Sequence, residues 1–121
     1  MKPAEDWIED WVCGVDEKRE RLIGRELVTI FQGFWNKLNL DSKSKSTRNR
    51  HANALHALAG HIIEDAIRRE VLDCEPRRRL MDSLYDDEGP LVYHDNENYQ
   101  RELDSVCRKL YKYLKAENSP S

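Results

Sequence analysis

Residues 16–38, DEKRERLIGRELVTIFQGFWNKL, decide the fold of this chain. Asp16 is a residue type that commonly caps a helix, and acidic side chains follow it in the first turns. Within this segment Gly24 and Gly33 each weaken a helix by about 1 kcal/mol relative to alanine, so we interpret them as places where another helix comes close. The large apolar residues recur at helical spacing and share one arc of about 160° on a helical wheel: Ile23, Leu27, Ile30, Phe31, Phe34, Trp35 and Leu38. This pattern predicts a long amphipathic helix with one buried face.

A short amphipathic helix is expected before this segment. Pro3 suits a first helical turn, and Gly14 suits the end of a helix. The apolar residues between them recur at helical spacing: Trp7, Ile8, Trp11, Val12 and Val15. We expect Trp7, Ile8 and Trp11 to cover the core, which is the favoured interpretation, or to form the middle of a self-association surface, where tryptophan is enriched.

A second long helix is expected beyond the polar linker of residues 39–46. Ser46 or Thr47 can cap its start, and Pro76 requires it to end near residues 73–75. The apolar residues of this segment again share one arc: Ala52, Leu55, Leu58, Ala59, Ile62, Ile63, Ala66 and Ile67.

Two further helices follow in the sequence. Pro76 can open a short helix over 76–85, and Asp95 or Asn96 can cap a last helix. Residues 91–93 lie between them and can form a tucked loop or a short extended piece, of which we favour the loop. The last helix is predicted to bury one face made of Tyr99, Leu103, Val106, Cys107, Leu110, Tyr113 and Leu114.

The composition agrees with a helical domain. The chain has 121 residues, the size of one domain, and 36% of them are charged, against about 25% in a typical protein. Glycine and proline are few, which favours helix over sheet. The sequence therefore predicts an all-α fold, a single compact bundle of four to five amphipathic helices over 1–117, with a frayed tail over 118–121.

Targeting and redox features are those expected of a cytoplasmic protein. No run of about 18 apolar residues is present, so we expect no membrane contact. The first residues are acidic, whereas a signal peptide needs a basic and then an apolar stretch. Cys13, Cys74 and Cys107 are odd in number and widely spaced, which is typical of reduced thiols. Cys107 is expected to be a small buried hydrophobic residue.

Charge is unevenly distributed along the chain, whose net charge is −3. Residues 43–50 carry four bases and no acid, and His51 follows them directly. Residues 82–104 carry eight acids against Arg101 alone. The basic segment can therefore dock on the acidic segment of the same chain, or bind an anion such as a phosphate or a nucleic acid beside a helix N-terminus. The residues of this predicted anion-binding site are Lys43, Lys45, Arg48, Arg50 and His51.

The histidines do not form a recognisable metal or catalytic motif. His51, His56 and His61 lie on one predicted helix but point in three directions at 100° per residue, so they cannot converge on one ion. His61 with Glu64 or Asp65 is the best local pair, and an exposed ion pair explains it equally well. No glycine-rich phosphate loop, CxxC pair, GxSxG or HExxH is present. We therefore assign no catalytic residues, no metal and no cofactor.

One dipeptide resembles part of an enzyme family. His94-Asp95 resembles the doublet of the HD-type metal phosphohydrolases, which are also helical. That family needs an upstream His and a downstream Asp, for which His51 and Asp104 are available. The doublet lies too close to the end of the chain for the usual helical layout.

Two acidic pairs resemble the motifs of a second family. Glu17-x-x-Glu20 and Glu70-x-x-Asp73 resemble the paired carboxylates with which the all-α nucleotide pyrophosphohydrolases hold Mg²⁺. The gap of about fifty residues between the pairs is longer than the pattern of that family. We interpret both pairs as parts of a solvated helix face, and neither resemblance places the chain in a family.

Three functions are compatible with these features. The favoured interpretation is a small cytosolic protein–protein interaction or adaptor module, with self-association as one form of it. The first alternative is a nucleic-acid or phosphate-binding regulator that uses the basic loop 43–50. The second alternative is a small helical metal-dependent hydrolase.

Overall fold

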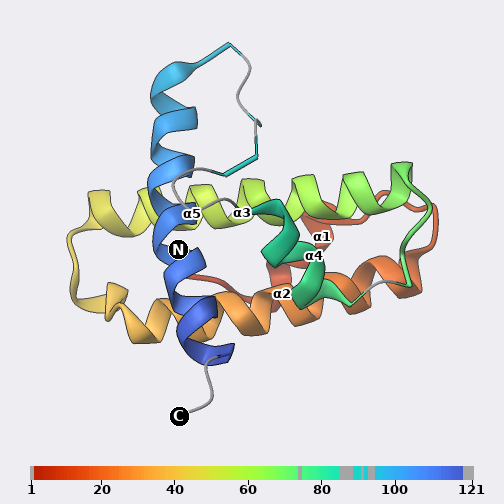
Figure 1. Cartoon of the computed structure of the whole chain (residues 1–121), viewed down its shortest axis with the longest axis horizontal. Helices are drawn as coiled ribbons and strands as arrows, with labels where there is room; N and C mark the ends of the chain where they lie inside the picture. The colour runs from red at the N-terminus through yellow and green to blue at the C-terminus, as the bar shows by residue number, and fades with distance from the viewer. Residues whose placement is uncertain (1, 74, 85–88, 91, 93–94, 119–121) are drawn as a thin grey trace.

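The computed structural model describes residues 2–73, 75–84, 89–90, 92 and 95–118, and the elements in this part of the chain are all helical. Two long antiparallel helices, α2 (Glu17–Lys37) and α3 (Lys45–Arg68), lie side by side and are joined by a short 3₁₀ turn over Leu40–Ser42 (Figure 1). The last helix, α5 (Glu97–Asn118), crosses both of them steeply. The predicted all-α bundle is confirmed.

The core lies between these three helices, and shorter elements close it. Figure 1 shows α4 (Pro76–Ser83) and α5 in front of the α2–α3 pair, with α1 (Ile8–Trp11) behind it. The arcs predicted for α2 and α3 are buried almost throughout. The largest side chains with less than 2% exposure are Trp35, Phe31, Phe34, Ile23, Leu27, Leu40, Leu55, Leu58, Ile62, Ile63, Leu80 and Leu103.

Both glycines of α2 lie where another element approaches, as predicted. A Cβ atom at Gly24 would lie 3.2 Å from the side chain of Ile8 and 3.3 Å from that of Trp11. A Cβ atom at Gly33 would lie 2.5 Å from the hydroxyl oxygen of Tyr113 in α5. The absence of side chains at these positions therefore lets α1 and α5 pack closely on α2.

The N-terminal helix is shorter than the prediction. A 3₁₀ turn over Glu5–Trp7 precedes α1, which ends at Trp11 and not at Gly14. Val12 is extended, and Val15 is 69% exposed and does not belong to the core. The chain leaves the helix here because the carboxylate of Glu20, in α2, accepts hydrogen bonds from backbone N–H groups of the connecting loop.

Both ends of α3 differ from the prediction. Ser44, not Ser46 or Thr47, caps the start, because its hydroxyl oxygen accepts a hydrogen bond from the N–H of Thr47. The helix ends at Arg68, before the predicted residues 73–75. Glu70 takes the left-handed conformation with φ 58°, and the N–H of Val71 donates to the carbonyl of Ala66 over 2.9 Å. These are the features of a Schellman motif, which satisfies the last carbonyls of a helix.

The two later helices follow the prediction with one exception. Pro76 opens α4, and the side-chain oxygen of Asn96 caps α5 by accepting the N–H of Tyr99 over 3.1 Å. Tyr99 is 55% exposed, contrary to its predicted place on the buried face, because the first turns of α5 project beyond α3 (Figure 1). Cys107 is fully buried, as predicted. The predictions for 91–93 and for the tail fall largely outside the described residues.

Within the described residues, no helix combines the length and the apolar character that crossing a membrane requires.

Candidate functional site

The four predicted anion-binding cations have different surroundings in the structure. The guanidinium group of Arg48 donates to the carbonyls of Asp41 and Lys43, at 3.4 and 3.3 Å, and so stabilises the turn before α3. Arg50 lies 3.9 Å from Glu102 of α5, which is the docking between basic and acidic segments that the sequence suggests. Lys43 and Lys45 are exposed and form no ion pair within the described part of the chain.

His51 is buried and positions a lysine from a distant part of the sequence. Its ring is 1% exposed, and Nδ1 lies 2.8 Å from the carbonyl oxygen of Thr47. A carbonyl only accepts hydrogen bonds, so Nδ1 carries the proton and Nε2 accepts from the Nζ group of Lys109 at 3.3 Å. An external anion therefore cannot reach the ring of His51, while Lys109 lies at the surface above it.

The charge state of His51 follows from these surroundings. Burial lowers the pKa of His51 from its ordinary value, and the positive charges of Lys109 and Arg50 lower it further. The hydrogen bond to the carbonyl of Thr47 acts in the opposite direction but does not outweigh them. His51 is thus a neutral imidazole at pH 7, and it holds a lysine in place without adding a charge of its own.

A polar groove runs between the start of α3 and the projecting half of α5. It consists of two hollows, of about 550 and 420 Å³, that share Arg50 and Glu102. The remaining residues of the first hollow are Lys45, Ser46, Asn49 and Asn53, and those of the second are Asn98, Arg101 and Ser105. Sequence reasoning missed Arg101 and Asn98, because they lie in a segment whose overall charge is strongly negative.

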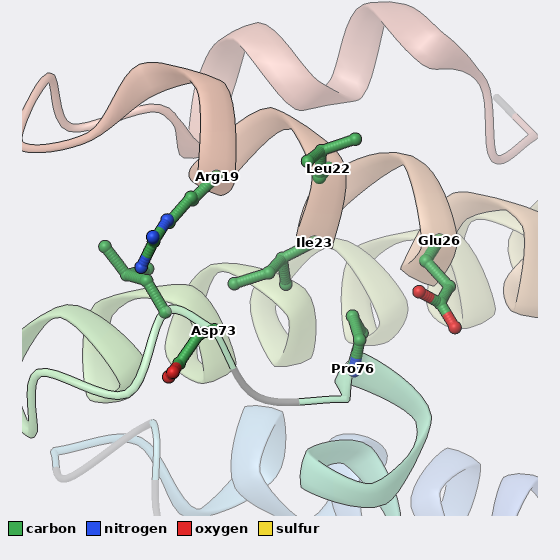
Figure 2. A pocket seen from close by; sticks show the side chains of 7 residues that line it. Arg19, Leu22, Ile23, Glu26, Asp73 and Pro76 are labelled. Atoms are coloured by element: carbon green, nitrogen blue, oxygen red, sulfur yellow. The ribbon is translucent and has the colours of Figure 1, made fainter.

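An apolar groove of about 410 Å³ lies between α2 and the connection from α3 to α4 (Figure 2). Leu22 is 53% exposed, although most of the other large apolar side chains of α2 are buried. Ile23 and Pro76 are buried. The polar residues that line the groove are Arg19 at one end and Glu26 and Asp73. No sequence feature singled out this groove, because its two walls are about fifty residues apart along the chain.

A third hollow, of about 420 Å³, surrounds a histidine–carboxylate pair. His56 Nε2 lies 3.0 Å from Asp10 Oδ2, and the His56 ring lies 5.3 and 5.5 Å from the rings of Trp7 and Trp11. The indole N–H of Trp11 donates to the carbonyl of His56 over 3.1 Å. These contacts attach the N-terminal segment to α3. The hollow is also lined by Ala57, Gly60, His61, Glu64, Arg68 and Val92.

The predicted interface residues have structural roles within the chain. Trp7, Ile8 and Trp11 are each 4% exposed and pack in the core. This position is the first of the two roles expected from the sequence. A self-association surface made of these three side chains would require α1 to leave the core.

The acidic pairs are not arranged as a metal site. Both carboxylate oxygens of Glu20 are occupied by backbone N–H groups, so this residue does not lie on the predicted solvated face. Asp65 was predicted as a partner of His61, but it is bound instead by Arg68, Arg69 and Arg79. The hydrogen bond from Arg68 is the main reason that the pKa of Asp65 is lowered. The described residues include no group of three or more His, Cys, Asp or Glu side chains able to hold a metal ion.

Comparison with known proteins finds no family model, no curated protein and no solved structure that matches this chain.

Proposed function

We propose that this protein is a protein–protein interaction module that acts in the cytosol and binds its partner in the apolar groove between α2 and the α3–α4 connection. The exposure of Leu22 is the observation that carries the proposal. A leucine that is 53% exposed beside buried apolar neighbours offers surface that a partner can cover. The volume of about 410 Å³ lies within the range of pockets that hold a ligand group.

The charges along the groove select the chemistry of the partner. Glu26 and Asp73 are both exposed and form no ion pair within the described part of the chain. Arg19 already lies 3.5 Å from Asp16, so its charge is partly compensated. The groove is therefore apolar with a carboxylate toward each end, Asp73 on the side of Arg19 and Glu26 on the other, and it fits a partner segment that presents a large apolar side chain next to Lys or Arg.

Two features support a cytosolic interaction module. Figure 2 shows Leu22 and Ile23 on α2 and Pro76 at the start of α4, so helices hold three of the four apolar side chains of the groove in place, while Leu72 lies on the connection from α3. Cys13 and Cys107 form no disulfide within the described residues, which suits a reducing compartment.

Selection from a random peptide display library on the immobilised protein tests this proposal. We expect selected peptides to carry a large apolar residue adjacent to Lys or Arg. The Leu22→Lys variant should bind them at least tenfold more weakly, because it removes the apolar contact and adds a positive charge. The Val15→Lys variant is the matched control, because Val15 is also exposed and apolar but lines neither groove nor the hollow around His56. It should bind the peptides as the wild type does.

A second variant separates the two parts of the recognition. Glu26→Gln with Asp73→Asn should retain the apolar preference and lose the preference for basic residues. Peptides that bind Leu22→Lys as tightly as wild type, or a selection that enriches no sequence, would contradict the proposal. If the wild type sediments as a dimer and the Leu22→Lys variant as a monomer, the occupant of the groove is a second copy of this chain and not a separate protein.

A further inference from the structure

We infer that the polar groove between α3 and α5 binds the phosphodiester backbone of a nucleic acid duplex. This surface is separate from the apolar groove, and no residue lines both. The inference begins with the side chains of the groove. Lys45, Arg50 and Arg101 face a single carboxylate, that of Glu102, so the groove has a net charge of +2 in a chain whose net charge is −3.

The uncharged residues of the groove are all hydrogen-bonding residues. They are Ser46, Asn49, Asn53, Asn98 and Ser105. Arginine, lysine, serine and asparagine side chains are among the groups with which proteins contact phosphate and sugar. A groove without an apolar side chain has little to offer an apolar peptide.

The cations of the groove are available for a ligand. Lys45 and Arg101 are exposed and form no ion pair in the described part of the chain. In the part of the chain that the structure describes, Glu102 is the ion-pair partner of Arg50, at 3.9 Å, and both side chains are more than 40% exposed. Such a pair contributes little to stability, so Arg50 can exchange Glu102 for a phosphate at low cost.

The size of the groove favours a strand over a single phosphate. Lys45 and Asn53 are separated by eight residues of α3, which corresponds to about 12 Å along the helix. The axis of a duplex advances about 3.4 Å per base pair, so a duplex lying along α3 would present three or four base-pair steps over that length. Polar side chains from α5 line the same groove, so donors from two helices flank a strand.

The lining of the groove selects a duplex among nucleic acids. Among the described residues, no aromatic side chain lines either hollow, and single-strand binding proteins depend on bases stacking on aromatic rings. The backbone of a duplex needs only cations and hydrogen-bond donors.

Fluorescence anisotropy with a labelled 20-base-pair DNA duplex of mixed sequence tests the inference. With three phosphate contacts, the logarithm of the binding constant should fall with the logarithm of salt concentration with a slope of about −2.7. Lys45→Gln with Arg101→Gln removes two of these contacts. It should weaken binding at least tenfold at 50 mM salt and reduce the slope to about −1.

Two further variants separate the groove from general charge effects. Lys18→Gln with Lys37→Gln makes the same change in net charge on exposed residues of α2 outside the groove, and it should alter the affinity less than twofold. Glu102→Gln should tighten binding about threefold, because it removes the carboxylate that competes with phosphate for Arg50. A loss of binding in Glu102→Gln would contradict the inference.

Other outcomes would also overturn it. No binding by the wild type at about 100 µM protein and 50 mM salt would exclude even weak non-specific affinity for DNA. An equal loss of affinity in the two double variants would show that binding depends on the net charge of the protein and not on the groove. Tighter binding to a single strand of the same length would show that the duplex is not the preferred ligand. Displacement of the duplex by polyglutamate at equal charge concentration would show that the groove binds polyanions in general. Displacement of the duplex by inorganic phosphate at equal phosphate concentration would show that the groove binds single anions and not a strand.

Discussion

At the scale of single residues, the carboxylate of Glu20 shapes the chain between α1 and α2. Its Oε1 accepts the N–H groups of Cys13 and Gly14 at 2.6 and 3.2 Å, and its Oε2 accepts that of Asp16 at 2.6 Å. Burial raises the pKa of Glu20, but hydrogen bonds from backbone N–H groups of Asp16, Cys13, Gly14 and Val15 outweigh it, so the pKa lies below its ordinary value. Glu20 is therefore a buried anion that local backbone dipoles stabilise.

The Glu20→Gln substitution should destabilise the protein by about 2–3 kcal/mol at pH 7, because hydrogen bonds to a charged group are lost and an amide NH₂ then faces a backbone donor. Because the folded pKa is lowered, the stabilisation from Glu20 is complete above the unfolded pKa and is lost as the pH falls through the folded value. Urea unfolding at several pH values between 7 and 3 measures this effect. The variant should lose less stability than wild type on acidification.

Glu17→Gln is the control for this prediction. Glu17 lies in the same turn of α2, but its side chain is 64% exposed. It should change stability by less than about 0.5 kcal/mol. Equal destabilisation by both substitutions would show that the charge of the first turn matters and the loop contacts do not.

At the scale of elements, the end of α3 determines where the α3–α4 connection lies. The left-handed conformation of Glu70 reverses the chain at the C-terminus of α3. The residues that follow, Leu72 and Asp73, then come to line the apolar groove together with α2. A helix that continued to residues 73–75, as the sequence predicts, would have carried these side chains elsewhere.

Glu70→Gly should stabilise the protein by about 0.5–1 kcal/mol. Glycine removes the cost of about 1–2 kcal/mol of a left-handed residue with a Cβ atom, and part of this gain is lost to the greater entropy of the unfolded chain. Glu70→Ala removes the same carboxylate but keeps the Cβ atom, so it should bring no comparable gain. Urea or thermal unfolding of the two variants measures the difference. Equal stability of the glycine and alanine variants would contradict the left-handed conformation of residue 70.

At the scale of the whole molecule, one core joins elements from both ends of the chain. Trp7 and Trp11 of the N-terminal segment, Trp35 of α2 and Leu110 of α5 all belong to the same buried cluster. The pair of Asp10 and His56 connects the N-terminal segment to α3 as well. No described element therefore has a core of its own.

This shared core predicts one cooperative unfolding transition. Urea unfolding followed by tryptophan fluorescence should coincide with unfolding followed by far-ultraviolet circular dichroism. A variant with Trp35→Phe reports fluorescence from the N-terminal segment alone and should show the same midpoint for both signals. An earlier fluorescence midpoint in that variant would show that the N-terminal segment separates from the rest of the core.

The helices could be predicted from the sequence because helix formation is largely local. The spacing of apolar residues in 16–38 and 51–67 identified the buried faces of α2 and α3, with Val15 and Tyr99 as errors beyond them. Pro76 and Asn96 marked helix starts through backbone chemistry that needs no tertiary contact. Glu70 gave no such signal, since a left-handed residue is usually glycine or asparagine.

The grooves could not be predicted, because each is made by residues that are distant in the sequence. The sequence by itself determined that this chain is a helical bundle, which faces of its helices are buried, and that a basic segment lies at the start of α3. Only the tertiary structure decided that Glu20 is a buried anion, that His51 holds Lys109 and that Arg101 shares a groove with Lys45. Helical periodicity depends on neighbours within one or two turns, whereas these arrangements depend on how α5 crosses α3 and how the loops close on α2.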